Sequence, residues 1–253
     1  MRIGVFDIFD PKVLSILDVN ATINTVASGF EWVEGPVWSG EDDALLFSDI
    51  PAHKVYRYKV GQGVSEYIHH NGFSNGLLFN RQQQLILLQS RSRQVGMLLA
   101  DSSVYSHTDM PVNQPEVPIK RAAVDLVKNA GSFNPNDYLV LANMYQGKKF
   151  NSPNDGVMSM KGQSKGTLYF TDPPCGLPKQ LDDPAKELDF QGVYALSPTG
   201  ELTLLDKSLV YPNGIALSPD EKNLYVAASN PARAAWYRYS LDNYGQVQSR
   251  KLF

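Results

Sequence analysis

Four polar side chains stand one or two residues before glycines that open apolar runs, and their chemistry suits a hard cation. They are one carboxylate and three carboxamides: Glu34, Asn75, Asn154 and Asn213. Carboxylate and amide oxygens are the ligands that Ca²⁺ and similar divalent ions prefer, whereas soft metals prefer sulfur. Taken singly, each is also an ordinary turn residue, because asparagine tolerates positive φ and bonds its own backbone. The metal interpretation therefore requires that these side chains meet in space.

Short strands in a repeat are the elements that would bring them together. A second apolar run begins nine to twelve residues after each glycine: Leu45–Phe47, Leu85–Leu87, Leu168–Phe170 and Leu224–Val226. A third run follows each of these: Val55–Tyr58, Val95–Leu98, Val193–Leu196 and Trp236–Tyr239. Short strands at a spacing of tens of residues, with turns between them, predict an all-β fold, the β-propeller. The innermost strand of every blade lines the central channel, so the four polar positions are expected to converge there.

The repeats are expected to span residues 30–60 and 63–98, with a third that begins at Tyr138–Leu141. Residues 99–137 break the period and are predicted to be an insertion in a single propeller domain that covers residues 1–253. Within the insertion, Val117–Lys128 has a mildly helical pattern, closed by a C-cap at Asn129–Gly131.

The composition excludes several other classes of protein. The chain has 253 residues, 43% apolar and 19% charged, which is an ordinary globular composition. Its net charge of −3 and the lack of a basic run argue against a nucleic-acid partner. A single cysteine, Cys175, excludes an intrachain disulfide and a multi-cysteine zinc site, and the four histidines lack metal-ligand spacing. Charges within the first 18 residues argue against a signal peptide or a membrane span, so a cytoplasmic location is expected.

Four motifs, in order, carry a resemblance to a known family: Glu34–Trp38, Tyr145–Asp155, Phe170–Pro174 and Tyr211–Glu221. They resemble those of the gluconolactonase family, which includes senescence marker protein (regucalcin). The resemblance implies a six-bladed β-propeller with one divalent metal in the channel, usually Ca²⁺, with Zn²⁺ and Mg²⁺ as alternatives. It implies Glu34, Asn154 and Asn213 as metal ligands.

The resemblance also implies a fifth-blade residue that this sequence does not contain. Family members use an aspartate at the start of the fifth blade as a further ligand and as the usual candidate for general base. The spacing of the four motifs places that residue beyond Phe253, so the catalytic residue is unassigned. About four of six blades are accounted for, and we expect the C-terminal blades to be missing from this sequence. Long unpaired sheet edges, which natural proteins avoid, would otherwise result.

Two further residues are candidates for substrate binding, Asn75 and Asp172. Asp172 either contacts substrate at the channel mouth or caps a turn before two prolines, and Asp155 is expected to anchor its loop. Ser152 stands where regucalcin-like relatives carry an arginine, so recognition of sugar acids does not transfer. His69 and His70 precede Asn75 and either touch a ligand or are loop residues without a role.

Two functions follow, of different classes. The first is a metal-dependent hydrolase that opens a sugar lactone or a similar small cyclic ester, with the cation polarising the carbonyl and activating water. The second is a propeller without catalysis, which binds calcium or a partner protein. A propeller of the strictosidine synthase-like or organophosphate-hydrolysing kind is a weaker third option, because the Ser152–Asp155 and Thr171–Pro174 runs fit it less well. The oligomeric state is not predicted.

Overall fold

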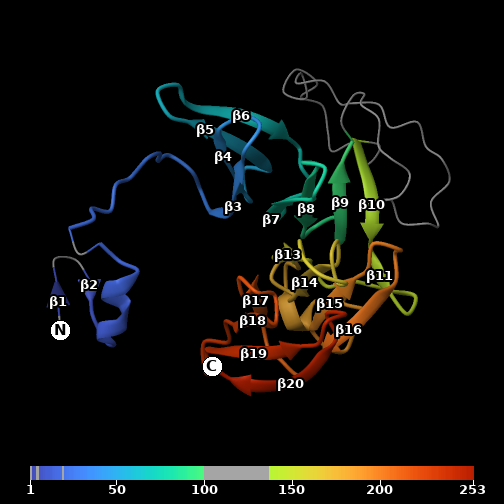
Figure 1. Ribbon diagram of the computed structural model, residues 1–253. Coiled ribbons are helices and arrows are strands. Elements are labelled where there is room, and N and C mark those ends of the chain that lie inside the picture. The colour runs from blue at the N-terminus through green and yellow to red at the C-terminus, as the bar shows by residue number, and fades with distance from the viewer. Residues whose placement is uncertain (1, 4–5, 19, 100–136) are drawn as a thin grey trace.

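The computed structural model describes residues 2–3, 6–18, 20–99 and 137–253, and its regular structure is almost entirely β. A short hairpin, β1 (Arg2–Ile3) and β2 (Phe6–Asp7), and the 3₁₀ turn η1 (Pro11–Ser15) precede the main body. The segment between η1 and β3 lies beside the end of the arc of sheets that β3 begins (Figure 1). No helix in the described part of the chain is long and apolar enough to cross a membrane.

Four sheets follow one another along the chain, each with four antiparallel strands paired in chain order. The first holds β3 (Val33–Ser39), β4 (Ala44–Asp49), β5 (Lys54–Lys59) and β6 (Gly63–His69). The second holds β7 (Ser74–Phe79), β8 (Leu85–Gln89), β9 (Gln94–Leu98) and β10 (Tyr138–Ala142). The third holds β13 (Gly156–Met158), β14 (Leu168–Asp172), β15 (Gly192–Leu196) and β16 (Leu202–Asp206). The fourth holds β17 (Pro212–Leu217), β18 (Asn223–Ala228), β19 (Ala235–Leu241) and β20 (Val247–Leu252).

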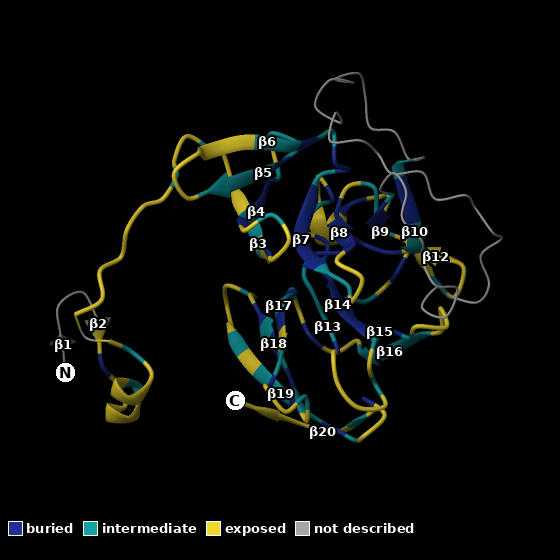
Figure 2. Cartoon of the chain, turned by 45° about the horizontal axis from the view of Figure 1, so that its top comes forward, coloured by how far each residue is buried: buried dark blue, intermediate teal, exposed yellow. Residues whose placement is uncertain are grey.

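The sheets pack face to face, and the core lies between them. One cluster of buried residues joins the first and second sheets through Leu46, Val55 and Leu87. Another joins the second and third through Ile86 and Phe170, and a third cluster joins the third and fourth sheets. The first strands touch in series, β3 with β7, β7 with β13, and β13 with β17. Figure 2 shows how the buried strands follow the arc. This is the arrangement of consecutive blades in a β-propeller.

Two boundaries of the predicted repeats are wrong. Tyr138–Ala142 does not begin the third repeat; as β10 it pairs with β9 at the outer edge of the second sheet. Likewise Gly63–His69 belongs to the first sheet, where it pairs with β5. Each sheet has a fourth strand, and an apolar pattern does not reveal the neighbour with which that strand pairs. The predicted insertion falls in the connection between β9 and β10, and residues 100–136, which include the helical pattern at Val117–Lys128, lie outside the described residues. The insertion stays a prediction.

Two small elements lie in loops next to the third sheet. A hairpin of β11 (Met144–Tyr145) and β12 (Lys148–Lys149) leads from β10 toward β13. The 3₁₀ turn η4 (Gln180–Asp182) lies between β14 and β15.

Candidate active site at the starts of the inner strands

The backbones around the motif glycines are in close contact. A Cβ built on Gly35 would lie 2.2 Å from the carbonyl oxygen of Asn75, and one on Gly76 would lie 2.8 Å from that of Asn154. The N–H of Gly76 donates to the carbonyl of Asn154 at 2.7 Å. Only glycine permits such an approach of two backbones. The starts of β3, β7 and β13 are therefore held side by side.

Asp155 and Thr171 connect the start of the fourth sheet to this group. The Oδ1 of Asp155 accepts from its neighbour Gly156 at 2.9 Å, and its Oδ2 accepts from the N–H of Ile215 in β17 at 3.0 Å. The hydroxyl of Thr171 donates to the carbonyl of Asn213 at 2.6 Å. Burial raises the pKa of Asp155, the nearby charge of Glu34 adds to this, and the two amide hydrogen bonds oppose it. The anchoring role expected for Asp155 fits these bonds.

The oxygen donors of the predicted metal ligands are largely unclaimed by the protein. Asn154 is 4% exposed and Asn75 9% exposed, yet neither carboxamide, nor that of Asn213, hydrogen-bonds to a described residue. Glu34 accepts one bond at Oε1, from the indole N–H of Trp32 at 3.0 Å. None of these carboxamide atoms is among the fully buried unpaired atoms, so they remain accessible to a cation or a substrate at this junction. One carboxylate with amide oxygens is a hard donor set, of the kind that Ca²⁺ takes.

The described part of the chain holds no metal site built only from charged, thiol or imidazole ligands. Among the residues that the structure describes, no three His, Cys, Asp or Glu side chains lie close enough to hold an ion. A site here would therefore depend on the asparagines.

The segment before Glu34 is fixed by a buried carboxylate. Asp49, at the end of β4, is 2% exposed and accepts from the N–H groups of Glu31 and Trp32, both at 3.1 Å. These two bonds hold the chain as it enters β3. Trp32, positioned in this way, in turn donates to Glu34.

Asp172 is fully buried at the end of β14. Its Oδ2 accepts from the N–H of Asn151 at 2.8 Å and its Oδ1 from that of Ser152 at 2.7 Å. Burial raises the pKa of Asp172 to about 7, although these two bonds oppose the rise. The side chain has no exposed surface through which to contact a substrate. Its two bonds hold the loop that carries Asn154, which is not the turn before Pro173 and Pro174 named as the alternative above. The role of Asp172 in substrate binding stays a prediction.

Ser152 is also engaged within the protein. Its hydroxyl donates to the carbonyl of Pro173 at 2.6 Å and accepts from the N–H of Gly176 at 2.8 Å. It lies fully buried, so it offers no replacement for an arginine that would face a ligand. Cys175, between these two partners, is exposed. Partial burial of its sulfur, together with the charge of Glu34, raises the pKa of this thiol.

Arg93 is a positioning residue that the sequence did not reveal. It lies in the turn between β8 and β9, and its Nε donates to the carbonyl of Phe150 at 2.6 Å. Its Nη1 donates to the carbonyl of Ala185 at 2.9 Å, and Glu187 lies 3.9 Å away. The guanidinium therefore fixes the other end of the Asn151–Asn154 loop. These partners lie 57 and 92 residues away, and no local pattern signals contacts at that separation.

Three histidines lie together where the first sheet meets the second. The Nε2 of His53 accepts from the N–H of Gly72 at 2.7 Å, and its Nδ1 lies 3.4 Å from the Nδ1 of His70. The His53 ring stacks on Phe73 at 3.9 Å, and His69 stacks on His70. Because Nε2 accepts, the proton of a neutral His53 is on Nδ1. Burial first, then the charges of His70, His69 and Arg91, lower the pKa of His53 to about 4.

This cluster predicts a loss of stability in acid. An unfolded histidine has a pKa of about 6.5, so the folded protein binds fewer protons at His53 and loses stability as the pH falls from 6.5 toward 4. We expect His53→Gln, which keeps an acceptor oxygen, to reduce this loss. The measurement is the midpoint of thermal unfolding at pH 7.5, 6 and 5 for both proteins. Asp155 and Asp172 titrate with the opposite sign but in both proteins, so the difference reports His53 and its coupling to His69 and His70. Parallel curves would contradict the prediction.

Comparisons with known proteins bear on this site. The family model described as the SMP-30/Gluconolactonase/LRE-like region matches residues 32–253. A gluconolactonase of Zymomonas mobilis is 36% identical over 254 residues, which cover 99% of this chain and 64% of that protein. This chain thus spans less than two thirds of the length of that relative.

Two solved structures have the same fold. A structure assigned to the gluconolactonases is 25% identical, with a TM-score of 0.69, over 97% of this chain and 70% of the other. A gluconolactonase of Xanthomonas campestris is 26% identical, with a TM-score of 0.66, over 88% of this chain and 63% of the other. The all-β fold predicted from the sequence is consistent with the similarity to these two structures.

Proposed function

We propose, from the premise that this chain belongs to the SMP-30/Gluconolactonase/LRE-like family, that its protein is a hydrolase that opens a sugar lactone or a similar small cyclic ester. The observation that carries the proposal is the meeting of the inner strands, with unpaired carboxamides at their starts, in a chain 36% identical to a gluconolactonase. The product would be the corresponding hydroxy acid.

In this proposal Glu34, Asn154 and Asn213 hold one divalent cation, Ca²⁺ in the first place and Mg²⁺ or Zn²⁺ as alternatives. A cation bound there would polarise a lactone carbonyl and favour ionisation of a water molecule. Of these three residues only Glu34 carries a negative charge, and its Oε1 is oriented by Trp32. Asp172 and Arg93 hold the loop of Asn154 in place. Asn75, on the neighbouring strand, is proposed to hydrogen-bond the substrate.

The proton of the attacking water requires a base, and the buried carboxylates near the site are already occupied. Asp155 and Asp172 each accept two backbone N–H groups. We propose that the full ring has six blades and that the base comes from a blade that follows the fourth sheet. The greater length of the relative supports this proposal.

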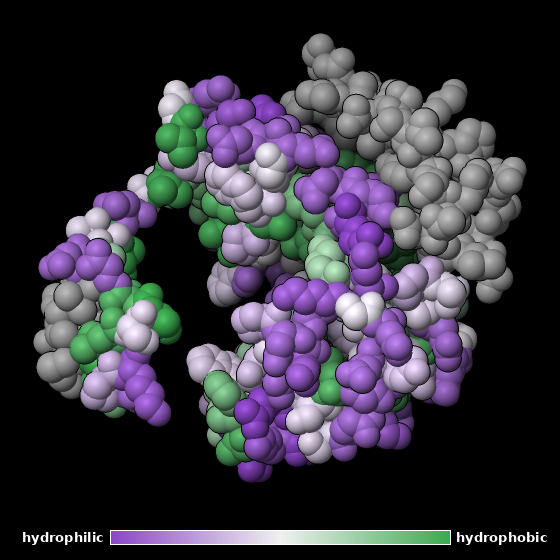
Figure 3. Space-filling view, in the orientation of Figure 1, coloured by the Kyte–Doolittle hydropathy of each residue, from purple (hydrophilic) through white to green (hydrophobic). Residues whose placement is uncertain are grey.

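The outer face of the fourth sheet also supports the proposal that further blades follow this sheet. Ile215, Ala216, Tyr225, Trp236 and Phe253 line an open apolar hollow on this face, and the last two are 63% and 66% exposed. Figure 3 shows apolar surface at this end of the arc. The corresponding faces of the other sheets are covered by a neighbouring sheet.

The test is hydrolysis of glucono-1,5-lactone by the protein that includes the blades proposed to follow the fourth sheet, followed in a pH-stat with added Ca²⁺ or with EGTA. We expect a rate above the spontaneous one with Ca²⁺ and a return to the spontaneous rate with EGTA. Calorimetric titration with Ca²⁺ is run in parallel. Binding without turnover on a panel of lactones would favour the non-catalytic propeller instead, and equal rates with and without chelator would exclude the metal-dependent mechanism.

A further inference from the structure

The first strands of three sheets share an irregularity at their polar residues. The register of each with its neighbouring strand shifts there: in β3 between Glu34 and Val37, in β7 between Ser74 and Leu77, and in β17 between Pro212 and Ile215. Such a shift takes backbone groups out of the regular ladder and turns side chains in a new direction. The backbone at Asn213 therefore takes a hydrogen-bond partner from outside its own sheet.

Thr171, in β14 of the third sheet, is that partner. Its hydroxyl donates to the carbonyl of Asn213 at 2.6 Å and accepts from the N–H of Asp155 at 3.3 Å. The hydroxyl also lies 3.5 Å from the carbonyl of Asp155, so the much shorter contact places its proton toward Asn213.

The backbone of Thr171 binds the other side of the same junction. Its carbonyl accepts from the N–H of Asn154 at 2.9 Å, and its N–H donates to the carbonyl of Asp155 at 3.0 Å. One residue thus connects Asn154, just before β13, with Asn213 in β17. Both asparagines are proposed ligands of the cation.

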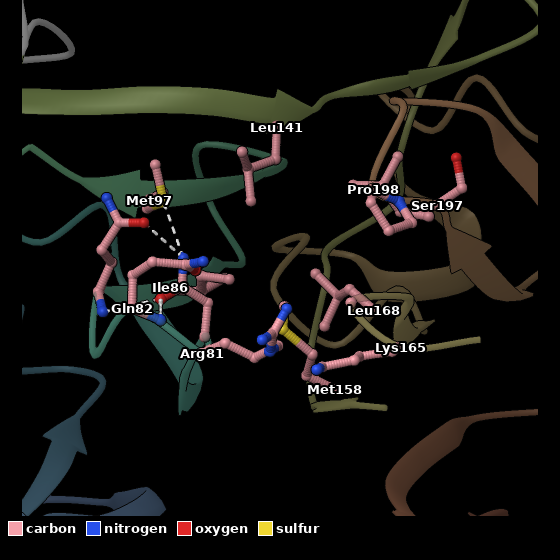
Figure 4. A pocket seen from close by; sticks show the side chains of 14 residues that line it. Arg81, Gln82, Ile86, Met97, Leu141, Met158, Lys165, Leu168, Ser197 and Pro198 are labelled. Carbon is pink, nitrogen blue, oxygen red and sulfur yellow. Dashed lines mark hydrogen bonds between the residues drawn. The ribbon is translucent and has the colours of Figure 1, made fainter. Parts of the chain in front are cut away.

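The Thr171 hydroxyl is carried by a rigid strand. All five residues of β14 are buried, and Thr171 itself is 0% exposed. At the other end of the strand, Leu168 lies with Ile86 and Met158 at the wall of a small cavity between the second and third sheets (Figure 4). Packing along the strand therefore fixes the point from which Thr171 reaches Asn213, and no water competes for the bond.

We infer that the hydroxyl of Thr171 sets the spacing of the Asn154 and Asn213 carboxamides and thereby selects Ca²⁺ over Mg²⁺. The inference rests on the proposed cation site and adds a positioning residue to it. Ca²⁺ takes about six to eight oxygen ligands, so it needs both asparagines held at once. Mg²⁺ keeps several waters and binds through few protein ligands, so it depends less on that spacing. Loss of the hydroxyl should therefore weaken Ca²⁺ more than Mg²⁺.

Paired variants test this through binding rather than turnover. Thr171→Val has the same shape without the hydroxyl, and Thr171→Ser keeps the hydroxyl. Dissociation constants for Ca²⁺ and Mg²⁺ are measured by calorimetry on the protein that includes the blades proposed to follow the fourth sheet. We expect Thr171→Val to weaken Ca²⁺ about tenfold and Mg²⁺ by less than about threefold, as suits one lost hydrogen bond. Thr171→Ser should keep the ratio of the two constants within about twofold.

Further variants separate positioning from a merely structural role. Thr171→Ala, compared with Thr171→Ser, repeats the loss of the hydroxyl with the methyl group absent from both, and it serves if Thr171→Val does not fold. Thr203→Val removes a hydroxyl from β16, the outer strand of the same sheet, and should leave the ratio unchanged.

The possible outcomes distinguish this inference from the proposed function. The inference alone is overturned if the unaltered protein binds Mg²⁺ as tightly as Ca²⁺, or if Thr171→Ser shifts the ratio as much as Thr171→Val does. It is also overturned if loss of the hydroxyl lowers the midpoint of thermal unfolding but keeps the ratio. If the unaltered protein binds neither ion, the proposed cation site fails, and the inference fails with it.

Discussion

Glu34→Gln is expected to remove the divalent-ion-dependent part of lactone hydrolysis and to lower kcat/KM by about 100-fold or more, the range seen when a group that stabilises transition-state charge is lost. Glu34 is the carboxylate among the three ligands proposed in this chain, so the change removes the negative charge that the chain contributes to the site. The variant keeps the side-chain size and an oxygen that accepts from the indole of Trp32. The fold should therefore be unaffected, and Ca²⁺ affinity should fall together with the rate.

The matched control is Glu31→Gln, three residues earlier on the same segment. Its side chain is exposed, and only its backbone N–H is used, in the bond to Asp49. Calorimetric Ca²⁺ titration and pH-stat rates on glucono-1,5-lactone are measured for both variants and the unaltered protein. If Glu34→Gln binds Ca²⁺ and hydrolyses the lactone as well as Glu31→Gln does, Glu34 is not a ligand and the proposed donor set is wrong.

Local patterns in the sequence predicted the inner strands and their polar starts. The polar residues lie in or just before the inner strands β3, β7, β13 and β17, and the second apolar runs form β4, β8, β14 and β18, as expected. Each depends only on alternation and turn residues within about fifteen positions, which a single sequence displays. The pairing of Tyr138–Ala142 was wrong because its partner lies across the insertion, and pairing is a property of the folded sheet.

The interactions that shape the site were beyond sequence reasoning for a similar reason. The hydrogen bonds of Arg93 to Phe150 and of Asp155 to Ile215 join residues 57 and 60 positions apart. A side chain of either type on a loop is unremarkable until the sheets are packed. Asp172 was a candidate because of its motif, but its full burial depends on the neighbouring loops. Contacts between sheets set these roles, and local propensity does not encode them.

Gly35→Ala is expected to have the largest effect on stability, because two separate costs act at this position. The residue has a φ of +57°, which costs an L-residue about 1–2 kcal/mol. A Cβ would also lie 2.2 Å from the carbonyl oxygen of Asn75 and 2.8 Å from the Cα of Gly76, and displacing packed groups typically costs about 1–3 kcal/mol more. We expect a loss of about 2–5 kcal/mol in the free energy of unfolding, measured by urea denaturation.

Substitutions at two other glycines separate the cost of the positive φ from the cost of the close contact. Gly61 has a φ of +77° with nothing within 4 Å of a built Cβ. The free energy of unfolding of Gly61→Ala should therefore fall only by the cost of the positive φ. Gly40 lacks a positive φ and also has open space, so Gly40→Ala should lose nothing. The loss of unfolding free energy in Gly35→Ala, minus the loss in Gly61→Ala, measures the contact between β3 and β7. The meeting of Glu34 with the asparagines depends on that contact. If the two variants are equally stable, that contact is loose, and the close approach of the first two inner strands cannot be what positions Glu34.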